Sequence, residues 1–155
     1  MIHLEEKQKA PDIKTKDQDG NNFSLAGLKG KKVVLYFYPK DNTPGCTAEA
    51  CNLRDNYSEL KKLGFEIVGI SPDNDKSHRK FIDKFSLPFT LLPDTDKKIV
   101  KNYGVWGEKK MYGKSYEGVL RTTFIIDENG IIMKIIKDVK TAGHAEQILK
   151  ELNIK

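Results

Sequence analysis

The chain has 155 residues, of which 38% are hydrophobic and 32% are charged, a balance that excludes a disordered or low-complexity protein. Its net charge of +5 comes from 27 basic and 22 acidic residues. The basic residues are spread along the whole sequence, whereas a nucleic-acid-binding protein more often gathers them in one run or on one face, so we expect no nucleic-acid partner.

The first half of the sequence alternates strand and helix patterns. After an N-terminal segment whose Asp19-Gly20-Asn21-Asn22 predicts a small hairpin, the apolar run 33–38 is typical of a strand buried on both faces. A helix is predicted from Pro44 to Leu63, with Thr43 as its N-cap and Gly64 as its end. The next expected elements are a strand over 65–70, a helix over 75–85, a strand over 89–92 and a helix over 96–103.

The second half begins with residues 104–120, which we predict to be a long connection. Its aromatic residues are expected to pack over the domain: Trp106, Tyr112 and Tyr116. Strand 122–126 then turns at Asn129-Gly130, a strong hairpin signal, into a return strand over 131–136, and a last helix covers 142–152. This order predicts one α/β domain over the whole chain, with parallel crossovers first and an antiparallel hairpin at the end of a mixed sheet.

The role expected of the two cysteines, Cys46 and Cys51, depends on the cellular compartment of the protein. No apolar run reaches the ~20 residues needed to cross a bilayer, and residues 1–7 lack the apolar core of a signal peptide, so we expect a cytoplasmic protein without a membrane partner. Stable structural disulfides are rare there, which favours a catalytic or redox-sensing pair. No zinc or other metal site is expected, because the histidines lie far away without ligand spacing: His3, His78 and His144.

Cys46 falls in the first turn of the helix that is predicted to follow strand 33–38. Unpaired backbone N–H groups and the helix dipole favour negative charge at that position, so they stabilise the thiolate, which is the attacking form. The alternative is a small buried cysteine that only fills space. The position at a helix N-terminus favours the reactive interpretation.

Cys51 follows Cys46 by five residues. On an intact helix, about 140° of rotation and a rise of about 7.5 Å would separate their Cα atoms by roughly 8.6 Å. A disulfide requires no more than about 7 Å, so a bridge would need the first turns of the helix to unwind. Gly45 favours such local melting. The spacing alone leaves open whether Cys51 reacts or only packs on the underside of the helix.

The segment Pro39-Lys40-Asp41-Asn42-Thr43-Pro44-Gly45-Cys46 matches the Pro-x-x-x-Thr-x-x-Cys pattern of peroxiredoxins. Together with Phe37-Tyr38 before it and Thr47-Ala48-Glu49-Ala50-Cys51 after it, the segment resembles the peroxiredoxin Q, or bacterioferritin comigratory protein, subfamily. Three later segments are also similar to that subfamily: 69–73, 103–110 and 121–124. The resemblance covers nearly the whole chain in the expected order.

The resemblance implies a thiol-dependent peroxidase that reduces hydrogen peroxide and organic hydroperoxides without a cofactor. Cys46 would attack the O–O bond and become a sulfenic acid. Taken singly, each of the remaining site residues has an ordinary structural explanation. The roles that the resemblance implies for them are orientation of the peroxide by Thr43, positive charge from Arg121, shielding of the sulfur by Pro39, and support of Arg121 by Glu49.

Cys51 matches the resolving cysteine of those subfamily members that carry it in the same helix. By resemblance, it would attack the sulfenic acid and form an intramolecular disulfide, which a thioredoxin-type dithiol would reduce again. A monomer is expected, since an intramolecular pair needs no partner chain.

Three other functions remain alternatives. The element order is that of a thioredoxin-like fold, so one is a thiol–disulfide oxidoreductase, although such proteins usually carry Cys-x-x-Cys. A redox sensor or chaperone would react slowly with peroxide and would not turn over. A nucleic-acid-binding module would show salt-dependent retention on DNA.

Overall fold

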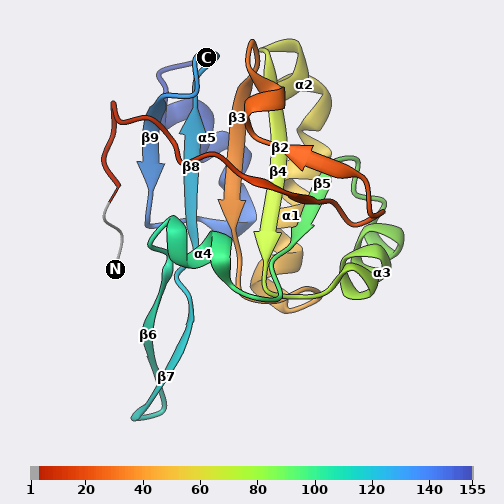
Figure 1. Ribbon diagram of the computed structural model, residues 1–155, viewed down its shortest axis with the longest axis vertical. Coiled ribbons are helices and arrows are strands. Elements are labelled where there is room, and N and C mark those ends of the chain that lie inside the picture. The colour runs from red at the N-terminus through yellow and green to blue at the C-terminus, as the bar shows by residue number, and fades with distance from the viewer. Residues whose placement is uncertain (1–3, 155) are drawn as a thin grey trace.

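A five-stranded mixed sheet forms the centre of the computed structural model, which describes residues 4–154 and leaves His3 outside (Figure 1). The strands lie in the order β5-β4-β3-β8-β9. The pairs β3-β4 and β4-β5 are parallel and the pair β8-β9 is an antiparallel hairpin, as the sequence predicts, and β3 also pairs with β8 in antiparallel orientation. The strands are β3 (Lys32–Phe37), β4 (Phe65–Ser71), β5 (Thr90–Pro93), β8 (Thr122–Ile126) and β9 (Ile132–Ile136).

Helices and short segments cover both faces of this sheet (Figure 1). One apolar cluster joins it to α1, α2, α3 and α5, and a second joins its other face to α4 and the N-terminal segment. No helix within residues 4–154 has the length and apolarity that a membrane span needs. The helical elements are η1 (Ala26–Leu28), α1 (Pro44–Asp55), α2 (Tyr57–Lys62), α3 (Asp75–Phe85), α4 (Lys98–Asn102), η2 (Thr141–Gly143) and α5 (His144–Glu151).

The single helix predicted from Pro44 to Leu63 is wrong in one respect, since the structure divides it into α1 and α2. The division falls at Asn56, whose φ of −108° and ψ of 7° are not helical. Its side-chain amide donates to the carbonyl of Asn52 at 2.8 Å, in competition with the backbone ladder. The other predicted elements differ from the observed ones by a few residues at their ends, and the short helix η2 precedes the last helix, α5.

The long connection predicted over 104–120 is also wrong. It is an antiparallel hairpin of β6 (Trp106–Met111) and β7 (Lys114–Val119), which projects from the body of the molecule (Figure 1). Tyr112 and Gly113 form its turn with φ values of 54° and 76°, the pair of positive values that a two-residue hairpin turn requires. Tyr112 is 96% exposed, so it does not pack over the domain as expected. The predicted N-terminal hairpin is confirmed as β1 (Lys14–Lys16) and β2 (Asn22–Ser24).

Candidate active site

Cys46 lies in the first turn of α1, where the chain has just left the C-terminal end of the central strand β3. Thr43 takes the N-cap position with extended backbone angles, and Pro44 begins the helix. The thiol is 1% exposed. The predicted position of Cys46 is therefore confirmed, at a helix end that favours negative charge.

Arg121 reaches the Cys46 sulfur from the neighbouring strand. It directly precedes β8, which runs antiparallel to β3 with Thr122 opposite Phe37, so the end of β3 and the start of β8 lie side by side. Its Nη2 donates to the sulfur at 3.3 Å. A Cβ atom on Gly45 would lie 3.2 Å from that nitrogen, so the glycine leaves room for the guanidinium.

Glu49, one helical turn after Cys46, is completely buried and accepts a hydrogen bond from Arg121 Nη1 through Oε1 at 2.7 Å. One guanidinium thus bridges the sulfur and the carboxyl group. Burial raises the pKa of Glu49 to about 7, although the charge and hydrogen bond of Arg121 act in the opposite direction. Burial lowers the pKa of Arg121, but the Cys46 and Glu49 charges outweigh it and raise that pKa above its ordinary value.

Two other predicted site residues, Pro39 and Thr43, lie on the loop between β3 and α1, and both are half-buried. The Thr43 hydroxyl donates to the carbonyl of Lys40 at 2.8 Å rather than capping the helix. Because its only proton is used in this way, the Thr43 oxygen is available to accept a hydrogen bond from a bound molecule.

Cys51 lies one and a half turns further along α1, half-buried, and both cysteines are free thiols. The helix is continuous between them, so the structure keeps the two thiols apart as the helix geometry predicts. Asn52, the next residue, ties this part of α1 to α5. Its Oδ1 accepts from the backbone N–H of Ala145 at 2.7 Å, and its Nδ2 donates to Glu146 at 3.3 Å.

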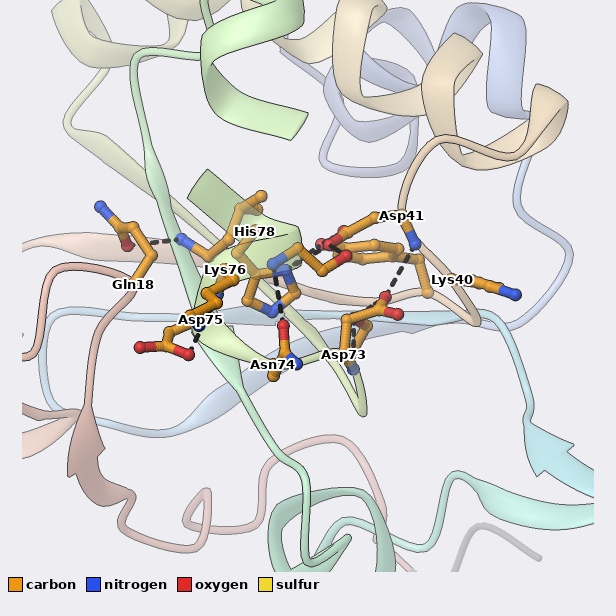
Figure 2. A network of polar contacts seen from close by, with 12 residues as sticks. Gln18, Lys40, Asp41, Asp73, Asn74, Asp75, Lys76 and His78 are labelled. Atoms are coloured by element: carbon orange, nitrogen blue, oxygen red, sulfur yellow. Dashed lines mark hydrogen bonds and ion pairs between the residues drawn. The ribbon is translucent and has the colours of Figure 1, made fainter. Parts of the chain in front are cut away.

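A buried polar network anchors the loop between β3 and α1 (Figure 2). Asp41 accepts from Tyr38 at 2.6 Å and from Ser77 at 2.7 Å, and its Oδ2 lies 2.7 Å from Nδ1 of His78. Asp41 also donates its backbone N–H to Asp73 at 2.7 Å. The ligand atoms of Asp41, Asp73 and His78 lie within 4.8 Å of one another, but these protein hydrogen bonds already use them. The network therefore fixes the loop that carries Pro39 and Thr43.

Sequence reasoning missed the two buried histidines of the structure, His78 in this network and His144 at the start of α5. The Nε2 atom of His144 lies 3.6 Å from Oε2 of Glu49. Neither histidine has a spacing signal in the sequence, because each meets its partner only through the sheet topology. Burial lowers the pKa of His144 to about 4, so the ring is neutral at physiological pH.

The raised pKa of Glu49 gives a testable pH dependence of stability. Between its ordinary value of 4.5 and about 7, the unfolded chain has lost a proton that the folded protein still binds. Unfolding therefore becomes easier as the pH rises through this window. We expect the wild type to lose up to about 3 kcal/mol of unfolding free energy relative to E49Q between pH 4.5 and 7.5.

Urea unfolding of both proteins at three pH values measures this difference. Because His144 titrates in both proteins, its contribution largely cancels. A difference that stays constant from pH 4.5 to 7.5 would contradict the raised pKa of Glu49.

Comparison with known proteins identifies the protein family to which this chain belongs. The model of the AhpC/TSA family matches residues 7–135. Peroxiredoxin Bcp of Bacillus subtilis is 46% identical over 145 residues, which cover 94% of this chain and 92% of the relative.

Solved structures agree with this assignment. A mutant of Xylella fastidiosa PrxQ matches with a TM-score of 0.91 at 30% identity, covering 99% of this chain and 98% of that one. The bacterioferritin comigratory protein of Xanthomonas campestris, solved for insight into its alkyl peroxide reduction activity, matches with a TM-score of 0.84 at 36% identity, covering 91% and 90%. The predicted thioredoxin-like fold is thereby confirmed. The chain belongs to the AhpC/TSA family, in its peroxiredoxin Q/Bcp branch, and is a thiol-dependent peroxidase that draws its electrons from a thiol reductant.

Proposed function

We propose that Cys46 is the peroxidatic cysteine of this peroxidase and that it reduces hydrogen peroxide and organic hydroperoxides. The contact of 3.3 Å between Arg121 and the buried Cys46 sulfur carries the proposal. The thiolate attacks the terminal oxygen of the hydroperoxide, the O–O bond breaks, and the departing oxygen takes up a proton to leave as water or alcohol. Cys46 becomes a sulfenic acid. The alkyl peroxide reduction of the Xanthomonas campestris protein supports organic hydroperoxides as substrates.

Arg121, Glu49, Thr43 and Pro39 prepare this step. Arg121 stabilises the thiolate and the negative charge that develops on the peroxide oxygens, and Glu49 holds the guanidinium in place. The Thr43 oxygen accepts the O–H of the hydroperoxide, because its own proton is donated to Lys40. Pro39 limits the access of water to the sulfur.

Cys51 then resolves the sulfenic acid. Its thiolate attacks the oxidised sulfur, a disulfide forms and water leaves. The continuous helix of α1 keeps the two cysteines apart, so resolution requires the helix to unwind and Asn52 to release its contacts with α5. We further propose a thioredoxin-type dithiol as the reductant, a monomeric state, one domain and a cytoplasmic location, with no nucleic acid or membrane as partner.

The experiment that tests this cycle is the rate of thiol loss when reduced protein meets one equivalent of hydrogen peroxide, followed by intact mass. We expect the wild type to lose two thiols orders of magnitude faster than free cysteine and to end as a monomer lighter by two hydrogens. In C51S the first step should remain fast, and the product should gain one oxygen.

A thiol loss as slow as that of free cysteine would contradict the role of Cys46 and favour the redox-sensor alternative. Fast loss that ends in an added oxygen in the wild type, or in a linked dimer, would keep Cys46 as the nucleophile and remove Cys51 from its role.

A further inference from the structure

The second oxygen of Glu49 has no hydrogen-bond partner among residues 4–154, although it is fully buried. Oε1 receives the hydrogen bond from Arg121, whereas Oε2 faces Nε2 of His144 at 3.6 Å. An unpaired oxygen in such a place costs more on an ionised carboxylate than on a neutral carboxyl group, because the ionised group loses more hydration on burial. Which nitrogen of the His144 ring carries the proton therefore decides whether Oε2 of Glu49 faces a hydrogen-bond donor.

The contacts of the His144 ring define its tautomer. The Gln147 side chain has a fixed orientation, because its Oε1 accepts from the backbone N–H of Lys140 at 2.9 Å and its Nε2 donates to the carbonyl of Asp138 at 2.7 Å. Oε1 is also the atom 2.9 Å from Nδ1 of His144, so Nδ1 carries the proton. In the neutral ring, Nε2 then accepts from the hydroxyl of Thr123 at 2.7 Å.

His144 consequently offers no N–H to Glu49, because the ring proton is on Nδ1 and the lone pair of Nε2 already accepts from Thr123. This arrangement disfavours the ionised carboxylate and favours the protonated one. Among residues 4–154, the other titratable groups that interact with this site are Arg121 next to β8, Tyr36 on β3 and Cys46 on α1, the helix of Glu49 itself. Of these, only Arg121 stabilises the ionised form, because a Cys46 thiolate repels it and burial keeps the Tyr36 hydroxyl neutral by raising its pKa.

Glu49 and the Cys46 thiolate compete for one guanidinium. When Glu49 is ionised, it neutralises Arg121, and less of the positive charge remains for the sulfur and the attacked peroxide. We propose that His144 is a positioning residue for the peroxidatic sulfur: by disfavouring the charged form of Glu49, it leaves the charge of Arg121 to Cys46. This inference rests on the proposed function of Cys46.

The substitution His144→Gln tests the link. A glutamine amide can donate an N–H to Oε2 of Glu49, which the neutral Nδ1-protonated ring cannot, so it stabilises the ionised carboxylate. We expect the midpoint of the Glu49 titration, followed by the ¹³C shift of its carboxyl carbon in the reduced protein, to fall by about one pH unit or more. The spectrum of E49Q identifies the signal.

The substitution Thr123→Val is expected to shift the midpoint of the Glu49 titration in the opposite direction. It removes the hydroxyl that occupies Nε2 of His144, so the freed lone pair can accept a hydrogen bond from the protonated carboxyl group of Glu49. The midpoint for loss of that shared proton should rise. The two shifts in opposite directions separate an effect on Glu49 from general loosening of the fold, and T123V remains informative if H144Q does not fold.

The functional measurement is the rate constant of Cys46 with hydrogen peroxide between pH 5 and 9. The wild-type profile should contain a step due to Glu49, which E49Q lacks. The pH of this step should fall in H144Q and rise in T123V by the same amounts as the carboxyl midpoints. I148V, a buried change one turn after His144 on α5, is the matched control and should leave both positions unchanged.

The proposal is overturned if the Glu49 midpoint is the same in H144Q, T123V and the wild type. It is also overturned if the midpoints move while the rate profiles stay where they are. Slow thiol oxidation of the wild type at every pH would instead reject the proposed function, and the titration of Glu49 without peroxide keeps the two failures distinguishable.

Discussion

Replacing Cys46 with serine is expected to lower the rate of hydrogen peroxide reduction by a factor on the order of 10⁴ or more. The serine hydroxyl occupies the same place beside Arg121, but it is not ionised at neutral pH and is a poor nucleophile toward an O–O bond. The fold should be retained, because the thiol is a small buried side chain and oxygen is a close substitute in size. Peroxide consumption with a dithiol reductant, followed with far-UV circular dichroism as a check on folding, measures the effect.

The matched control for this prediction is C51S, which alters the other thiol of the same helix. It should keep the fast first oxidation and lose only the efficient formation of the disulfide. If C46S reacts rapidly with one equivalent of peroxide and C51S does not, the assignment of the two cysteines is reversed.

Replacing Arg121 with leucine is expected to slow the oxidation of Cys46 by roughly 10²- to 10³-fold. The substitution removes the only cation that contacts both the sulfur and the Glu49 carboxyl among residues 4–154. R121K keeps a charge but has no planar fork with which to contact two acceptors at once, so we expect it to recover only part of the rate. Stopped-flow oxidation of the reduced protein measures all of these variants.

K109Q controls for the loss of positive charge near the site. Lys109 lies close enough for Arg121 to contribute to its lowered pKa, which burial lowers most, but its amine donates to the carbonyl of Val119 rather than to Cys46. Its oxidation rate should change far less than that of R121L. Equal losses in K109Q and R121L would show that general charge, and not the contact with the sulfur, activates Cys46.

The central sheet could be predicted from the sequence because its strands carry their own signals. The run 33–38 is apolar on both faces, and Asn129-Gly130 specifies the turn before β9, so β3, β8 and β9 are recovered nearly to the residue. Cys46, with the loop before it, follows from the same logic, because a helix start after a buried strand is visible in the order of residues.

The rest of the fold and site depends on contacts that local patterns do not encode. β6 and β7 consist largely of exposed polar residues, so their hairpin lacks the apolar alternation that identifies a strand. The break at Asn56 arises from one side-chain hydrogen bond in an otherwise helical segment. His78 and His144 become neighbours of Asp41 and of Glu49 only after the chain has crossed the sheet.

The placement of β3 between β4 and β8 has a consequence for biosynthesis. β3, α1 and β4 leave the ribosome early, but Arg121 follows Cys46 by 75 residues and the antiparallel neighbour β8 comes with it. A nascent chain that ends before this point carries the cysteine without its cation and leaves one edge of β3 open. The reactive thiol is thus assembled only late in synthesis, when the strand that completes the sheet also delivers the charge that activates the sulfur.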